Sequence, residues 1–167
     1  MEYTPGEKII YGMHGICTVR EIETGPAGGK KQEYYVLEPS EHPDAIYYVP
    51  VHNAAASAKL RRMLTRDELT GLLREEQGRD SAWVSDENLR KQRYRQLIGN
   101  SDPAALLSMV HTLHRHKTAQ LAAGRKLHIC DESFLRDAEK LLSAEISYVM
   151  CIPLQDVEAY VRDVFQE

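Results

Sequence analysis

The one tryptophan of the chain, Trp83, follows a polar stretch at residues 78–82 and lies in the only segment with a net positive charge. Residues 58–126 carry 14 Lys and Arg against 8 Asp and Glu, whereas residues 1–57 carry 4 against 8 and residues 127–167 carry 3 against 9. A large apolar ring beside concentrated positive charge suits a polyanion, because the ring can unstack bases while basic groups neutralise phosphates. The competing interpretation is a ring packed in the core against a neighbouring helix.

Basic side chains follow Trp83 in a segment with the spacing of a helix. Lys91 and Arg95 fall on its polar face, whereas Arg90 and Arg93 fall among apolar positions, from which long side chains can reach the helix edge. More positive charge lies near the end of the next predicted helix, at Arg115, Lys117, Arg125 and Lys126. An ordinary solvated helix face is the competing interpretation of such a charge run.

Four histidines most resemble a metal site, namely His111, His114, His116 and His128. Helical geometry points the first three in separate directions and leaves two of them, His111 and His116, in solvent. Because zinc needs ligands that converge on one centre, we predict no metal site. The chain also lacks a Gly-rich phosphate loop and the hydrolase motifs, so we predict a binding protein without a cofactor rather than an enzyme.

Two pairs of adjacent tyrosines, Tyr34–Tyr35 and Tyr47–Tyr48, fall on neighbouring predicted strands. Because consecutive side chains of a strand face opposite ways, each pair directs one ring inward and the other outward. An outward ring can anchor a protein partner, since tyrosine is favoured at such surfaces. Cross-strand aromatic packing is the competing interpretation.

Short strands that must position these tyrosines precede residue 54. The alternation of apolar residues and the turn signals predict strands at 7–11, 16–22, 33–38 and 45–51. Glycines bracket a tight connection at residues 12–15, and a second turn is expected at residues 25–29. Four short strands separated by turns favour a small, strongly curved antiparallel barrel.

Helical spacing dominates the rest of the chain. Thr65 and Glu68 are spaced as a capping box, and Asp102 before Pro103 has the order of an N-cap and a first turn. Ser85 is the expected cap of the helix after Trp83, and Gly78 and Gly124 are expected helix ends. Further helices are predicted to begin near Asp131 and Pro153. We therefore predict an α+β protein with a β domain at 1–55 and an all-α helical bundle at 56–167.

The composition, with 43% hydrophobic and 28% charged residues, is that of a globular protein. We expect no signal peptide, because the first residues lack its basic and apolar regions. No apolar run approaches the roughly 20 residues that span a bilayer. Three cysteines without CxxC pairing indicate reduced thiols rather than a disulfide framework. We expect a cytoplasmic protein that acts as a monomer.

Three stretches together resemble the opening of CarD-like bacterial transcription regulators: GEKIIYGMHGICTV at 6–19, EYYVL at 33–37 and YVPVHN at 48–53. The same module opens the polymerase-interacting region of transcription-repair coupling factor. In CarD, this module is followed by a helical domain with a tryptophan in a loop and basic residues after it. The present chain has both parts in that order.

The resemblance implies a Tudor-like or SH3-like N-terminal domain that binds the RNA polymerase β subunit. It also implies a helical domain that contacts promoter DNA, without reading its sequence, at the upstream edge of the transcription bubble. Trp83 would wedge into the minor groove and hinder re-closure of the melted duplex. The implied phosphate contacts are Arg90, Lys91, Arg93 and Arg95. The implied polymerase contacts are Gly25, Tyr48 and Val49, and they make this interface more aromatic than that of relatives with arginines there.

Two other functions stay open at this point. One is a protein-only adaptor that binds polymerase or another protein, with Trp83 in the core and DNA untouched. The other is a helical protein that binds a metal or ligand through its histidines.

Overall fold

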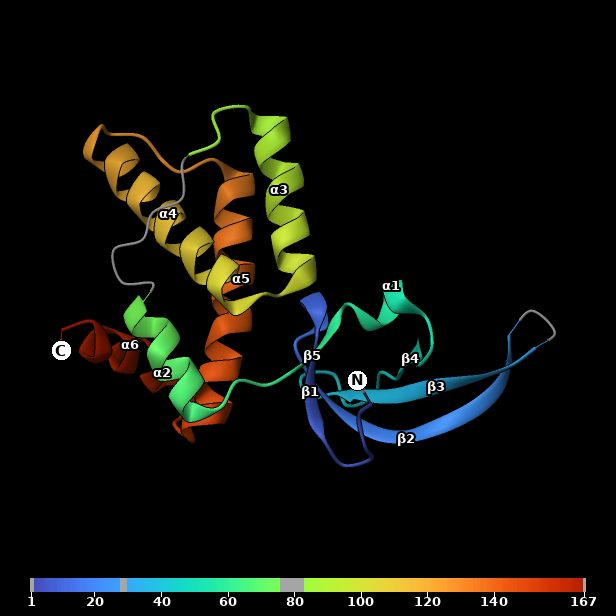
Figure 1. The fold of residues 1–167 in the computed structure, drawn as a ribbon. Helices are drawn as coiled ribbons and strands as arrows, with labels where there is room; N and C mark the ends of the chain where they lie inside the picture. The colour runs from blue at the N-terminus through green and yellow to red at the C-terminus, as the bar shows by residue number, and fades with distance from the viewer. Residues whose placement is uncertain (1, 28–29, 76–82, 167) are drawn as a thin grey trace. The chain divides into compact units, whose positions relative to one another are not determined.

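The computed structural model describes residues 2–27, 30–75 and 83–166. By its internal contacts the chain divides into two units, Met1–Met63 and Leu64–Glu167. The first is an antiparallel sheet and the second is built of helices, which confirms the predicted α+β class (Figure 1). The boundary between the units lies between residues 63 and 64 of the sequence rather than between 55 and 56, because a strand beyond residue 55 completes the sheet.

Five strands form the N-terminal unit, in the order β4-β3-β2-β1-β5 with every neighbouring pair antiparallel. Their bounds are β1 Lys8–Tyr11, β2 Ile16–Ala27, β3 Lys30–Pro39, β4 Tyr47–Pro50 and β5 Leu60–Arg62. A short helix, α1 (Ala54–Ser57), precedes β5, and a 3-10 turn, η1 (Gly12–His14), joins β1 to β2. Gly12 and Gly15 both have positive φ, 44° and 72°, so the predicted tight connection depends on these glycines.

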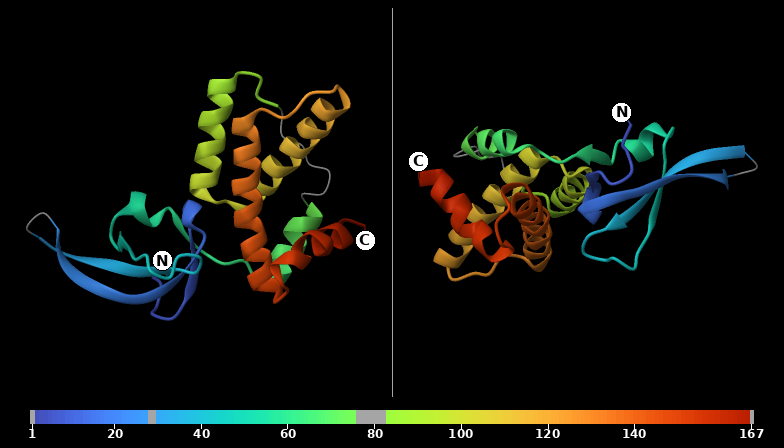
Figure 2. Two further views of the ribbon diagram at one scale, coloured as in Figure 1. Left: turned by 180° about the vertical axis from the view of Figure 1, so that it is seen from behind. Right: turned by 90° about the horizontal axis from the view of Figure 1, so that it is seen from below.

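β2 and β3 run together well beyond the other strands (Figures 1 and 2). β4 pairs only with Tyr34–Leu37 of β3, so the distal part of β2 and β3 is a two-stranded ribbon. The turn expected at residues 25–29 does not begin at Gly25, because β2 continues to Ala27, where it pairs with Lys30. A proline at residue 26 fits this position, since edge strands tolerate prolines.

The core of the N-terminal unit follows the predicted alternation along β2. Cys17 and Val19 are fully buried, and a β-bulge then shifts the register between Val19 and Glu21. The other buried members come from every part of the sheet and its N-terminal arm: Tyr3, Ile9, Tyr35, Leu37, Val49 and Leu60. Leu60 belongs to β5, a strand that the sequence did not predict because its three residues include two arginines.

Helices α2 (Arg66–Glu75), α3 (Glu87–Asn100), α4 (Pro103–Ala122), α5 (Ile129–Met150) and α6 (Val157–Gln166) form the C-terminal unit, with a 3-10 turn η2 (Leu154–Asp156) before α6. The capping box before α2 is present: Glu68 N donates to Thr65 Oγ1 at 3.1 Å, and Thr65 N donates to Glu68 Oε2 at 2.9 Å. Asp102 caps α4 by accepting from Ala105 N at 3.2 Å. Gly78, the expected end of α2, lies outside the described residues.

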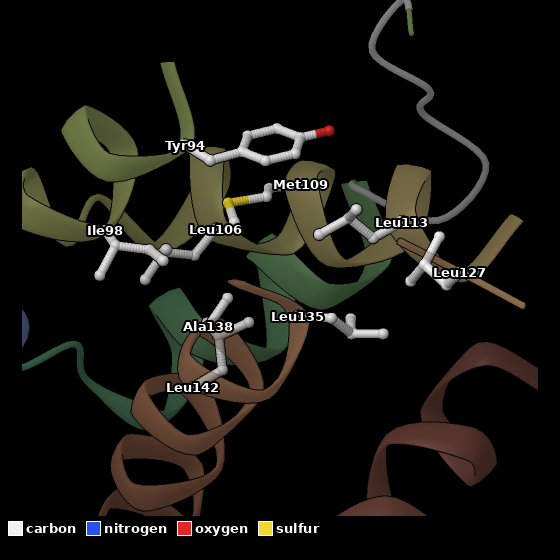
Figure 3. Packing of buried hydrophobic residues seen from close by; sticks show 9 residues of the cluster. All are labelled: Tyr94, Ile98, Leu106, Met109, Leu113, Leu127, Leu135, Ala138 and Leu142. Atoms are coloured by element: carbon white, nitrogen blue, oxygen red, sulfur yellow. The ribbon is translucent and has the colours of Figure 1, made fainter. Parts of the chain in front are cut away.

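Two apolar clusters stabilise the helical unit, and α5 contributes to both. The larger cluster joins α3, α4 and α5 and is drawn in Figure 3; its buried members are Tyr94, Ile98, Leu106, Met109, Leu113, Leu127, Leu135, Ala138 and Leu142. The smaller cluster joins α2, α5 and α6 through Leu69, Leu73, Ile146 and Val157. None of the helices in the described residues is long and apolar enough to cross a membrane.

Candidate functional site

Trp83 lies in the segment that leads into α3, and its side chain is only partly buried. Its ring packs against the larger apolar cluster and stacks on His116 of α4, with ring centroids 3.6 Å apart and planes 8° from parallel. The guanidinium carbon of Arg90 lies over the same ring, 4.5 Å from its centroid. We call Trp83, Arg90, His116 and Asp131 the Trp83 cluster.

The cap of α3 sets the direction in which this segment enters the helix. Asp86, rather than the expected Ser85, is the N-cap, and its side chain accepts from Leu89 N at 2.9 Å. Aspartate and serine are both favoured caps, so the sequence alone does not distinguish two adjacent candidates. The shift by one residue leaves the carbonyl of Val84 to accept from Arg90 Nη1 at 3.0 Å.

Arg90 forms a buried ion pair instead of the exposed phosphate contact implied by the resemblance. Its Nε and Nη2 donate to the two carboxylate oxygens of Asp131, at 2.8 and 2.9 Å. The residues are 6% and 1% exposed, and donation of these hydrogen bonds to Asp131 raises the pKa of the Arg90 guanidinium. Since all these donors have protein partners, Arg90 holds α3, α5 and the Val84 backbone together.

Lys91 is also held within the protein. Its Nζ lies 2.7 Å from Glu87 Oε1, one helical turn earlier, and His128 Nε2 lies 3.5 Å from the same oxygen. Hydrogen bonding within the pair lowers the pKa of Glu87 and raises that of Lys91. A phosphate at Lys91 has to compete with this carboxylate.

Arg93 and Arg95 are exposed, and neither pairs with an acidic side chain among the described residues. Residues two positions apart in a helix, such as these arginines, are separated by about 160° around its axis, so their side chains point to different sides of α3. Arg125 and Lys126 are likewise exposed in the connection from α4 to α5. This connection lies at the same end of the helical unit as the start of α3 (Figure 1), where His128 Nε2 lies 3.5 Å from Glu87 Oε1.

The histidines do not form a metal site. His114 pairs with Glu139 of α5, whereas His116 stacks on Trp83 and contacts Gln120. Across the described ranges no group of three or more His, Cys, Asp or Glu side chains is placed to hold a metal ion. The expectation that His116 is solvated was wrong, because its partner Trp83 comes from a loop that is distant in sequence.

On the sheet, one face carries a row of residues that we call the tyrosine surface: Gly25 of β2, Tyr34 of β3 and Tyr48 of β4. Tyr34 packs over Gly25, where an added Cβ would lie 3.7 Å from the Tyr34 ring. The Tyr34 and Tyr48 rings meet edge to face, 6.5 Å apart at 87°. Tyr48 is 56% exposed, whereas Tyr35 is buried and Tyr47 packs against the core, so each pair has one inner and one outer ring.

Comparison with known protein families gives a match over almost the whole N-terminal unit. Residues 3–64 match the family model described as the CarD-like/TRCF RID domain, a match that runs from the N-terminal arm through β5. The chain carries a CarD-like domain. The family recognised from the sequence is thereby confirmed, and it is a family of RNA polymerase-interacting transcription factors. Domains of this family are Tudor-like interaction domains. No curated protein matches the chain.

Within the CarD-like domain, the structure buries the side chain of Val49, which the resemblance implied as a polymerase contact. Its side chain is 1% exposed and packs in the core opposite Tyr35, so only its neighbour Tyr48 reaches the surface. Strand alternation separates the two residues, which belong to opposite faces of the sheet. Tyr34 was not among the predicted contacts, although the adjacent pair Tyr34–Tyr35 already signalled one outward ring.

Two members of the Trp83 cluster were also missed. Asp131 lies in the first turn of α5, where an acidic residue is ordinary, and nothing in its local sequence indicates a buried partner 41 residues away. His116 was expected to lie in solvent rather than against an aromatic ring. Their positions follow from how α3, α4 and α5 pack, not from local spacing.

Proposed function

We propose that the protein is a transcription regulator that binds the RNA polymerase β subunit and stabilises the open promoter complex. The CarD-like domain supplies polymerase binding through the tyrosine surface. Its helical unit contacts DNA, without reading sequence, at the upstream edge of the bubble. The observation that carries the proposal is the CarD-like match together with Trp83, a partly exposed aromatic ring in the only segment of the chain with a net positive charge.

Trp83 acts as the wedge in this proposal. An apolar side chain inserted at a base step of the minor groove disturbs stacking and hinders re-pairing of the melted strands. Cations nearby lower the cost by contacting phosphates and releasing counterions. Arg93 and Arg95 of α3, with Arg125 and Lys126 of the α4–α5 connection, are the exposed groups that can do so.

Arg90 and Lys91 have roles in this arrangement other than the direct phosphate contact that the resemblance implied. Arg90 supports the Trp83 ring, since its guanidinium is occupied by Asp131 and Val84. Lys91 contributes to the positive field and contacts phosphate only when it leaves Glu87.

The decisive measurement is the lifetime of the open complex formed by polymerase on a promoter limited by melting. With protein at saturating concentration, Trp83→Ala is expected to shorten the lifetime roughly tenfold, because without the wedge the melted strands re-pair sooner. Leu154→Ala is the matched control, since it removes another exposed apolar side chain of the helical unit. Equal lifetimes for Trp83→Ala and wild type, with polymerase binding intact, exclude the wedge.

One observation favours a second function, a protein-only adaptor. The Trp83 ring packs against the apolar cluster and is stacked on one face by a protein ring, as a structural tryptophan would be. An adaptor requires that Trp83→Ala lowers the stability of the helical unit but leaves the open-complex lifetime unchanged. Thermal unfolding and the lifetime assay on the same variant therefore separate the two functions.

A further inference from the structure

We propose that His116 is a positioning residue for Trp83. Together with the ion pair of Arg90 and Asp131, it fixes the ring in one orientation in the free protein, so that the wedge is formed before DNA arrives. The inference rests on the proposed function and adds residues that do not themselves contact DNA.

The first support is the stack between the two rings. A centroid separation of 3.6 Å and an angle of 8° give almost complete overlap of the Trp83 and His116 rings. Parallel contact of this kind restricts rotation of the tryptophan about both of its side-chain torsions. His116 is itself fixed, because its Nε2 lies 3.1 Å from the Gln120 amide nitrogen one turn later on α4.

The second support is the way in which Arg90 contacts both the ring and the adjacent backbone. Its guanidinium lies over the Trp83 ring at 4.5 Å and donates to the Val84 carbonyl at 3.0 Å. Asp131 holds that guanidinium through two hydrogen bonds from the interior. Side chain and backbone of the wedge are therefore fixed by α3, α4 and α5 together.

A fixed ring has an energetic advantage over a mobile one. A side chain that must be ordered when it inserts loses rotamer freedom at that moment, and this loss weakens binding. In the Trp83 cluster the ordering has already occurred during folding. The part of the ring that remains exposed can thus enter the duplex without a further conformational search.

The position of the ring can be measured directly, because Trp83 is the only tryptophan and reports alone in fluorescence. His116→Ala removes the stack and is expected to raise the acrylamide quenching constant of Trp83 about twofold, with a red-shifted emission. His116→Phe restores an aromatic partner and should return both values towards wild type. His114→Ala is the control, since it removes a histidine of the same helix that pairs with Glu139 rather than with Trp83. Unchanged quenching in His116→Ala overturns the proposal.

The contribution to function is measured on the same variants. His116→Ala should shorten the open-complex lifetime roughly two- to tenfold, the range expected for loss of one aromatic stack, and His116→Phe should restore it. In the background of Trp83→Ala, the further change His116→Ala should have no effect. A lifetime for His116→Ala equal to or longer than wild type overturns the proposal, because the stack would then be idle or would hold the ring away from DNA.

Failure of the wedge and failure of the positioning are distinguishable. If Trp83→Ala itself leaves the lifetime unchanged, the proposed function is wrong, and the positioning of a wedge falls with it. If Trp83→Ala shortens the lifetime and His116→Ala does not, the wedge stands and only the role of His116 is refuted.

Discussion

The guanidinium of Arg90 meets the carboxylate of Asp131 through two parallel hydrogen bonds, Nε to Oδ1 at 2.8 Å and Nη2 to Oδ2 at 2.9 Å, in the interior of the helical unit. This paired geometry is the strong form of an arginine–carboxylate interaction. It links α3 to α5 across 41 residues of sequence and places a charge beneath the Trp83 ring. Arg90, which was expected to contact phosphate, is thus part of the support behind the Trp83 ring.

Removing the acidic partner should destabilise the helical unit strongly. Asp131→Ala leaves the Arg90 guanidinium buried without its counter-charge, and loss of one member of a buried pair typically costs about 3–5 kcal/mol. Urea unfolding followed by circular dichroism measures the loss. Asp137→Ala, at an exposed position of the same helix, is the control and should cost less than about 0.5 kcal/mol. A comparable small loss at Asp131 would show that the pair contributes little.

Charge removal at the exposed arginines should change the salt dependence of DNA binding. Each phosphate contact contributes roughly 0.9 to the slope of log K against log salt concentration for a duplex. Arg93→Gln and Arg95→Gln should be compared singly, because the two side chains point to different sides of α3. Substitution of the arginine that faces the duplex should lower the slope of log K against log salt concentration by about 0.9. Arg162→Gln on α6 serves as the control, and a slope reduced equally by all three variants indicates only a general field effect.

Alanine substitutions at Tyr48 and Val49, adjacent residues of β4, should have opposite effects on polymerase binding and on the stability of the fold. Tyr48→Ala removes an exposed ring and should weaken polymerase binding roughly tenfold or more, as for an aromatic anchor, with unfolding unchanged. Val49→Ala opens a cavity in the core and should destabilise the CarD-like domain by roughly 1–3 kcal/mol. Titration against polymerase and thermal unfolding on both variants test the pair. Retained affinity in Tyr48→Ala counts against the tyrosine surface.

A buried thiol makes the stability of the protein depend on alkaline pH. Burial raises the pKa of Cys17 from 9.0 to about 11. The folded state therefore keeps its proton where the unfolded state has lost it, so this contribution to stability is complete below pH 9 and is lost as the pH rises towards 11. Unfolding of wild type should weaken more steeply over this range than that of Cys17→Val. Tyr3 and Tyr94, whose pKa values are also raised by burial, titrate in both proteins and cancel in the comparison.

Local signals predicted the features that depend on residues close together in sequence. The capping box of Thr65 and Glu68 and the cap at Asp102 are present, because their hydrogen bonds span three residues. The inner and outer tyrosines follow from alternation along one strand. The motifs of the N-terminal unit also sufficed to recognise the CarD-like family.

The features that the sequence did not predict depend on contacts between distant segments. β5 is recognisable only through its pairing with β1, since Leu60–Arg62 alone is too short and too charged to indicate a strand. From the sequence alone, Arg90 is expected to lie at the surface, because its buried partner Asp131 is 41 residues away. The same holds for the stack of His116 on Trp83, which no periodicity within α4 could indicate.

The place of α5 in both clusters of the helical unit has a consequence for synthesis of the chain. The CarD-like domain has all its strands once residue 62 has left the ribosome, and it can fold while the rest is being made. The helical unit is completed later, because the last buried residue of the larger cluster is Leu142 and that of the smaller cluster is Val157. Until Asp131 has left the ribosome, Arg90 lacks its counter-charge, and the ion pair that links α3 to α5 cannot form. The CarD-like domain can therefore fold well before the helical unit is complete.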